Sequence, residues 1–223
     1  MAGSITFDLF HTLLHGADDE RDRVVARMGE LVGVEPAALV QAYHDTWRDR
    51  LVRWDAARTV RILSRRLGGS PSPAQVEQAV ALRLELAGRV LAAVSPTTLN
   101  VLDTLRSQGW RLGLVSNATS ETAQAWPGSA LARRFDVAVF SCDLGVAKPD
   151  REIYLAATQG LGAPAEQCVY IGDGADGELA GAAALGMTVF RTTEHNDTDP
   201  CWPGPINASL SEVFPLLQAA SVT

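Results

Sequence analysis

The sequence has few cysteines, no long apolar run and no basic leader. Its three cysteines, Cys142, Cys168 and Cys201, are too few and too scattered for a disulfide framework or a zinc knuckle. No apolar run reaches the roughly 18 residues that a membrane-spanning helix needs. The N-terminus also lacks a basic segment followed by an apolar run, which is the pattern of a secretory signal. We therefore expect a cytoplasmic protein that makes no membrane contact.

Positive charge is scarce as well. The chain has 19 lysines and arginines against 26 aspartates and glutamates, and its net charge of −7 argues against a nucleic-acid partner. With 47% hydrophobic and 20% charged residues, the composition is that of an ordinary globular protein. A length of 223 residues allows one large domain or a domain that carries an insertion.

The segment from residue 15 to residue 94 shows only helical patterns. Apolar residues recur there at helical spacing, and Asp, Gly, Ser and Pro residues mark the helix ends. The predicted helices span residues 18–33, 36–54, 55–67 and 72–90. Because no strand pattern interrupts them, they are predicted to form a small helical bundle inserted after the first strand.

The rest of the chain alternates between strands and helices. Strands are predicted at residues 4–7, 111–115, 137–140, 168–171 and 187–190, and helices at 96–107, 120–134, 150–161, in the Ala-rich stretch up to 186, and at 209–220. This alternation predicts an α/β fold, with a parallel sheet and helices on both faces. In such sheets the ligand binds outside the carboxyl ends of the strands. Asp8, Ser116, Lys148 and Asp173 all fall at or just beyond those ends.

Four short motifs at these strand ends resemble the haloacid dehalogenase superfamily, which consists mostly of phosphatases. They are Asp8 with Thr12, then Ser116 followed by Asn117, then Lys148 in AKPD, then Asp173 in IGDG with Glu178 five residues later. The resemblance covers essentially the whole core. It implies a discontinuous catalytic core of residues 1–14 and 95–223, three-layered and Rossmann-like with a mainly parallel sheet. Residues 15–94 would form an inserted all-helical cap.

The resemblance also implies a chemical role for each motif. Asp8 would attack phosphorus and form an aspartyl phosphate that water later hydrolyses. Lys148 would place its positive charge against Asp8 and the transferred phosphoryl group, and Ser116 would donate a hydrogen bond to a phosphoryl oxygen. Thr12 and Asn117 would help to bind the substrate, a small anionic molecule.

A Mg²⁺ ion completes the site that the resemblance implies. Its ligands would be the Asp8 carboxylate, the backbone carbonyl of Phe10 and the Asp173 carboxylate, with Glu178 contributing through water. Such an ion would neutralise charge that otherwise repels an attacking carboxylate from an anionic substrate.

The sequence departs from the family at Phe10. Phosphatases of the family usually carry a second Asp at this position, which protonates the leaving oxygen and then activates water. General acid–base help is typically worth about 10²–10⁴-fold, so a phosphatase without it is expected to be slow unless something replaces the acid. His11, with a suitable intrinsic pKa, is one candidate replacement. A leaving group that needs no protonation, such as that of an acyl phosphate, is the other solution.

Phe10 also opens two alternatives to a phosphatase. The 2-haloacid dehalogenase branch has an aromatic residue at this position, forms an ester on its Asp without metal, and has a residue like Tyr154. Against that branch, the chain keeps Asp173 and lacks an arginine between Arg27 and Arg48, where the branch places a carboxylate-binding arginine. The other alternative is a degenerate member that binds a ligand without turnover. We favour the phosphatase.

Two features of the predicted cap bear on substrate binding. Seven arginines lie close together in sequence: Arg48, Arg50, Arg53, Arg58, Arg61, Arg65 and Arg66. Such a run usually forms a solvated helix face, although one or two members could bind an anionic substrate. Trp47 and Trp54 are seven residues apart and share a helix face, which favours a place in the core of the bundle.

Overall fold

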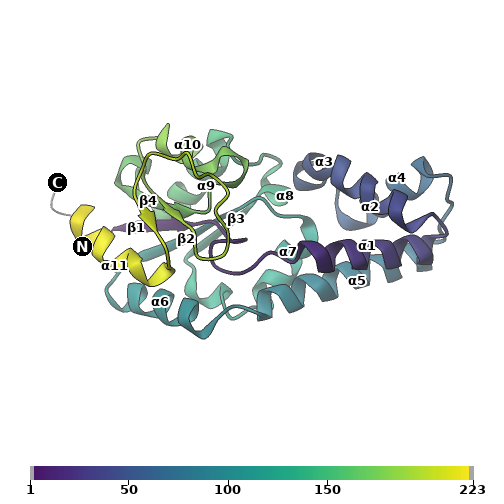
Figure 1. The fold of residues 1–223 in the computed structure, drawn as a ribbon, viewed down its shortest axis with the longest axis horizontal. Helices are drawn as coiled ribbons and strands as arrows, with labels where there is room; N and C mark the ends of the chain where they lie inside the picture. The colour runs from purple at the N-terminus through teal and green to yellow at the C-terminus, as the bar shows by residue number, and fades with distance from the viewer. Residues whose placement is uncertain (1–2, 221–223) are drawn as a thin grey trace.

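The computed structural model describes residues 3–220 and is built around a six-stranded parallel sheet (Figure 1). Its strands are β1 (Ser4–Phe7), β2 (Arg111–Ser116), β3 (Val137–Phe140), β4 (Cys168–Gly172), β5 (Thr188–Thr192) and β6 (Ile206–Asn207). They lie in the order β3-β2-β1-β4-β5-β6, and each neighbouring pair is parallel. The α/β prediction is confirmed. Because β1 lies between β2 and β4, the residue that follows it, Asp8, stands near the middle of the carboxyl edge.

Helices cover both faces of the sheet and give the core three layers. Successive strand residues point to opposite faces. Ile5 and Phe7 therefore pack in one apolar cluster with α6 (Pro96–Ser107) and α11 (Val213–Ala220). Val115 and Tyr170 belong to a second cluster, with α9 (Arg151–Leu161) and α10 (Glu178–Ala183).

Five helices separate β1 from α6 in the chain. They are α1 (Asp18–Val32), α2 (Pro36–Asp45), α3 (Trp47–Val52), α4 (Ala56–Arg66) and α5 (Pro73–Ala92). The apolar faces of α1, α2, α4 and α5 form a cluster of their own around Val25, Met28, Leu39 and Leu63, whereas α3 packs against α8 (Ser141–Leu144). Helices α1 and α5 run side by side away from the sheet (Figure 1). The all-helical insertion is therefore present, and the division at residues 14/15 and 94/95 stays a prediction.

Local sequence explains where several of these helices begin. Pro36, Pro73 and Pro96 each occupy a first helical position, where the missing N–H costs nothing. Ser72, just before α5, forms a capping box in which its hydroxyl accepts from the backbone N–H of Gln75 while the Gln75 side chain accepts from the backbone of Ser72.

Two predicted helices are broken in the structure. The helix expected over 36–54 stops at Thr46, whose hydroxyl donates to the carbonyl of Ala42 at 2.6 Å, and it resumes as α3. The helix expected over 120–134 is wrong beyond Ala125. There α7 (Ser120–Ala125) gives way to 3-10 turns at Trp126–Gly128 and Ala132–Arg134, since a proline within Trp126–Gly128 lacks the N–H that a longer helix needs.

Two short elements were not predicted. Helix α8 (Ser141–Leu144) lies between β3 and Lys148, and β6 contributes only two residues after a Pro-rich stretch. Neither is long enough to show a periodic pattern in sequence. Among residues 3–220, no helix combines the length and the apolar character needed to cross a bilayer.

Candidate active site

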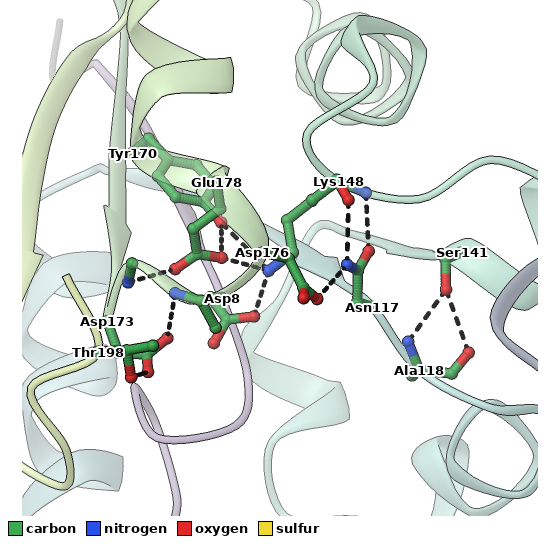
Figure 2. Close-up of polar contacts among 12 residues, drawn as sticks. Asp8, Asn117, Ala118, Ser141, Lys148, Tyr170, Asp173, Asp176, Glu178 and Thr198 are labelled. Carbon is green, nitrogen blue, oxygen red and sulfur yellow. Dashed lines mark hydrogen bonds and ion pairs between the residues drawn. The ribbon is translucent and has the colours of Figure 1, made fainter. Parts of the chain in front are cut away.

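The carboxyl edge of the sheet brings three of the predicted motifs into contact. Lys148 Nζ lies 2.5 Å from Asp8 Oδ1 and also forms an ion pair with Glu178 (Figure 2). Lys148 is the one lysine in the sequence, and its side chain is 3% exposed. An ammonium group buried this deeply is stable only when it is paired, and two carboxylates provide the pairing here.

A third carboxylate completes the cluster. Carboxylate oxygens of Asp8, Asp173 and Glu178 lie within 4.8 Å of one another, and all three residues are buried. The cluster thus holds three carboxylates and one ammonium group, which is paired with Asp8 and Glu178, and it is short of two positive charges. Hard oxygen donors in this number and spacing suit a divalent cation such as Mg²⁺.

Shifted pKa values reflect this shortage of positive charge. Burial raises the pKa of Asp8 and of Glu178 despite the opposing attraction of Lys148. Repulsion from Asp173 adds to the rise at Asp8, and repulsion from Asp8 adds to the rise at Glu178. Burial also raises the pKa of Asp173, with a further contribution from Glu178. Burial lowers the pKa of Lys148, but the two carboxylates outweigh it and the net shift is upward. The cluster therefore holds a firmly protonated ammonium beside carboxylates that need a further cation to stay ionised together.

Glu178 is held by the protein on both of its oxygens. Tyr170 donates its hydroxyl to Oε2 at 2.7 Å, and the backbone N–H of Gly174 donates to Oε1 at 3.0 Å. Gly172 leaves room for this carboxylate, because a Cβ there would collide with it. Tyr170 was not predicted as a site residue, because a tyrosine within an apolar strand such as CVYI is typical of the core.

Asp173 accepts hydrogen bonds from a side chain and a backbone group that were not predicted to lie at the site. The hydroxyl of Thr198 donates to its Oδ2, and the backbone N–H of Ala175 donates to Oδ1 at 3.3 Å (Figure 2). Thr198 belongs to the polar segment between β5 and β6. Thr198 itself is exposed, yet this loop reaches the acidic cluster.

The second motif contributes a hydroxyl without a partner. Ser116 is fully buried at the end of β2, and among the described residues its Oγ has no hydrogen-bond partner. Thr12 Oγ1, also fully buried, is unpartnered within residues 3–220 as well. An unsatisfied buried hydroxyl costs about 1–3 kcal/mol. Both hydroxyls are thus available to an oxygen-rich ligand that reaches them.

Asn117 connects the second, third and fourth motifs. Its Oδ1 accepts from the backbone N–H of Lys148 at 2.8 Å, and its Nδ2 donates to the Lys148 carbonyl at 3.3 Å and to Asp176 at 2.8 Å (Figure 2). The amide therefore fixes the backbone that carries the lysine. The expected contribution of Asn117 to substrate binding stays a prediction, as do the catalytic and metal-binding roles of the other motif residues.

A cavity of about 260 Å³ opens between the cap helices and this edge of the sheet. Asp8, Lys148 and Asn117 line it from the core, and Phe10 and His11 line it from the loop after β1. The ring of Phe10 is half-buried and also packs against the apolar core.

The cap lines the cavity with two arginines from outside the run between residues 48 and 66, which we expected to form a mainly solvated helix face. Arg21 of α1 and Arg83 of α5 reach the cavity, whereas six of the seven arginines between residues 48 and 66 are exposed. The seventh, Arg50, is buried against the rings of Tyr43 and Trp47 at 4.5 and 5.1 Å. Trp47 lines the cavity, so its predicted place in the bundle core is wrong.

Sequence comparison identifies the family. Residues 4–186 match the haloacid dehalogenase-like hydrolases. The chain belongs to this family. The resemblance seen in the four motifs is thereby confirmed, and the protein is a haloacid dehalogenase-like hydrolase.

Relatives of this hydrolase include both phosphatases and dehalogenases. Glyceraldehyde 3-phosphate phosphatase of Methanopyrus kandleri is 30% identical over 144 residues, 62% of this chain and 60% of the relative. The chain thus spans less than two thirds of that phosphatase. (S)-2-haloacid dehalogenase 4A of Burkholderia cepacia is 29% identical over 97% of this chain and 95% of the relative. The crystal structure of a HAD phosphatase from Thermococcus onnurineus superimposes with a TM-score of 0.71 at 19% identity, covering 96% of this chain and 97% of that one, which shows the shared fold.

Proposed function

We propose that this hydrolase is a Mg²⁺-dependent phosphatase that acts on a small phosphorylated molecule through an aspartyl phosphate on Asp8. The observation that carries the proposal is the charge of the buried cluster, in which three carboxylates lie together with one ammonium group. A divalent cation supplies the two missing positive charges. Metal-free chemistry would gain nothing from the buried Asp173 carboxylate next to the nucleophile, because it has no ion pair within the described residues and unpaired buried charge is costly.

Each residue of the cluster has a task in this reaction. An oxygen of Asp8 attacks phosphorus, while the ammonium of Lys148 neutralises charge on both the carboxylate and the phosphoryl group. The unpartnered hydroxyl of Ser116 donates to a phosphoryl oxygen and gains the hydrogen bond that the fold does not give it.

The metal would be held by the Asp8 and Asp173 carboxylates and the backbone carbonyl of Phe10. When bound, Mg²⁺ would neutralise charge on the phosphoryl oxygens and orient the group for in-line attack. Both oxygens of Glu178 already accept hydrogen bonds from Lys148, Tyr170 and Gly174. Contact through water therefore suits Glu178 better than direct ligation.

A 2-haloacid dehalogenase is the second candidate. Phe10 and the near full-length similarity to the Burkholderia cepacia dehalogenase favour it. The buried Asp173 weighs against it. The dehalogenase branch has uncharged residues at the fourth motif, where this chain has Asp173. A ligand-binding member without turnover is a third candidate, and the intact cluster of Asp8, Lys148 and Glu178 argues against it.

The test is a substrate panel of phosphate monoesters, an acyl phosphate and 2-haloacids, each with Mg²⁺ and with EDTA. We expect phosphate release that EDTA and Asp8→Asn both abolish. Halide release that EDTA does not affect would replace the phosphatase with the dehalogenase. Tight ligand binding without any turnover would replace both with the third candidate.

A further inference from the structure

The cavity beside the acidic cluster has a largely apolar wall. Phe10, Trp47 and Val90 line it with half-buried side chains, and Leu86 and Leu91 line it from α5. An apolar cavity of about 150 Å³ can bind benzene. The present cavity, at about 260 Å³, is large enough for one aromatic ring together with a phosphoryl group.

The two arginines of the cavity are already neutralised by the protein. Arg83 Nε lies 3.0 Å from Glu121 Oε1, and the side chains are 9% and 4% exposed. A terminal nitrogen of Arg21 lies 2.9 Å from the Asp18 carboxylate. An arginine held in this way has little charge left for a substrate anion, because its carboxylate partner repels that anion.

The remaining charged groups do not change this balance. Asp18 and Asp176 line the cavity and repel a second anionic group on the substrate. His11 can carry a positive charge, but its Nε2 lies 3.9 Å from the same Asp18 carboxylate. Apart from Lys148, which is committed to the phosphoryl site, the lining residues described here contain no cation without an acidic neighbour.

Phe10 restricts the leaving group. When Asp8 attacks, a new O–P bond forms and the P–O bond to the organic group breaks, so that the electron pair departs with the oxygen. Without an acid at position 10, that oxygen leaves as an anion and takes its proton from water. A phenol, with a pKa of about 10 as in tyrosine, leaves in this way much more readily than an alkanol. Water then attacks phosphorus, the Asp8–phosphorus bond breaks and returns its electron pair to the carboxylate, and inorganic phosphate is released with a proton passed to solvent.

From the apolar wall, the neutralised arginines and Phe10, we propose that the substrate is the phosphate monoester of an uncharged phenol. This inference rests on the phosphatase function proposed above and narrows it. The ring lies against Phe10, Trp47 and Val90, and the ester carries no second carboxylate or phosphate.

Three matched esters test the inference with the full chain and Mg²⁺: phenyl phosphate, cyclohexyl phosphate and 3-carboxyphenyl phosphate. Phenyl and cyclohexyl phosphate have similar size and apolar surface but differ in the leaving group, and we expect kcat/KM to favour the phenyl ester at least about 100-fold. The carboxyphenyl ester keeps a phenol as leaving group and adds one charge. We expect its kcat/KM to fall at least about tenfold below that of phenyl phosphate, mainly through KM.

A charge variant tests the role of the arginine partners. Asp18→Asn removes the nearer of the two carboxylates paired with Arg21 and leaves Asp22, whose Oδ1 lies 3.7 Å from Arg21 Nε. The change alters an exposed side chain, so the fold should be retained. We expect the preference for phenyl over 3-carboxyphenyl phosphate to shrink about fivefold. Asp19→Asn is the matched control, because Asp19 is the neighbouring acid of the same helix turn and does not line the cavity, and it should leave the preference unchanged.

The outcomes separate the inference from the phosphatase proposal. If phenyl phosphate is hydrolysed in an Mg²⁺- and Asp8-dependent way but 3-carboxyphenyl phosphate is the better substrate, the uncharged substrate class is wrong. Equal rates for the cyclohexyl and phenyl esters would also overturn it. They would show that an acid protonates the leaving oxygen, and His11 is the candidate nearest to Phe10 in sequence. If none of the three esters is hydrolysed but an acyl phosphate is, the phenol ester is wrong as substrate and the phosphatase proposal stands. If no phosphorylated compound is hydrolysed, the phosphatase proposal itself fails.

Discussion

Replacing Phe10 with aspartate is the most direct test of how this site works. The change introduces a carboxylic acid where phosphatases of the family usually have one, on a loop whose side chain already lines the cavity with Asp8. An acid in this place can protonate the leaving oxygen and then activate water, which together are worth about 10²–10⁴-fold. We expect Phe10→Asp to raise kcat/KM for cyclohexyl phosphate by at least about 100-fold, or about 2.7 kcal/mol of transition-state stabilisation.

Phe10→Asn is the matched control for the loss of the aromatic ring. The ring is half-buried against the core, and its removal should cost about 1 kcal/mol of folding free energy in either variant. Asparagine has nearly the same shape as aspartate but cannot transfer the proton. The ratio of kcat/KM for Phe10→Asp over Phe10→Asn therefore isolates acid–base chemistry from the change in cavity shape.

The assay is release of inorganic phosphate at saturating Mg²⁺, with urea unfolding to verify that both variants are folded. The gain should be smaller for phenyl phosphate than for the cyclohexyl ester, because a phenol needs less protonation. Equal activity of two folded variants would refute the idea that a missing acid limits the enzyme.

Three further substitutions probe other parts of the site. Ser116→Ala removes a buried hydroxyl that has no partner among the described residues. Urea unfolding should therefore show equal or greater stability, by up to about 1 kcal/mol, while kcat/KM falls about 10²-fold. A clear loss of stability would show that the hydroxyl is satisfied in the fold. Thr198→Val removes the hydroxyl that donates to Asp173 and should weaken Mg²⁺ binding several-fold by calorimetry, whereas unchanged affinity would limit Thr198 to loop structure. Arg83→Gln leaves Glu121 buried without its partner and should cost about 3–5 kcal/mol at pH 7.5.

The Arg83→Gln variant also makes a prediction about pH. In the native protein burial raises the pKa of Glu121, but Arg83 and local hydrogen bonds outweigh it and hold the pKa below its usual value. Glu121 therefore stabilises the fold above its unfolded pKa, and this contribution is lost as the pH falls through the folded pKa. In the variant the attraction of Arg83 is gone and only the local hydrogen bonds oppose burial. The pKa of Glu121 therefore rises, and the stability deficit against wild type should shrink between pH 7.5 and pH 5. A deficit that does not change with pH would rule out an ionised, unpaired Glu121.

The residues that the sequence analysis found share one property. Asp8, Ser116 and Asp173 each stand at the end of an apolar strand, and in a parallel sheet this position alone brings them to the same edge. Contacts between these distant residues did not have to be predicted one by one, because the parallel topology brings the strand ends together. The same regularity explains why most helix and strand bounds were predicted within a few residues.

The residues that it missed make contacts that no local pattern encodes. Tyr170 reads as a core residue of β4, and its hydroxyl matters only because Glu178 lies eight residues away on α10. Thr198 is one polar residue in a polar loop, 25 residues from the Asp173 that it contacts. Trp47 has the spacing of a bundle-core residue, yet it lies where the cap faces the core. Each depends on how separate elements pack, which periodicity within one element does not determine.

The location of unfavourable groups is itself an argument for function at this edge of the sheet. Asp8, Asp173 and Glu178 raise one another's pKa values, and the buried hydroxyls of Thr12 and Ser116 lack partners in the described chain. Groups that destabilise a fold are removed readily by mutation unless something other than stability retains them. Here they gather around the end of the central strand, where a metal and a phosphoryl group would relieve the repulsion and satisfy the hydroxyls together. A purely structural role would leave either the carboxylate repulsion or the hydroxyls without compensation. Bound phosphate and Mg²⁺ should together raise the unfolding midpoint more than the sum of their separate effects.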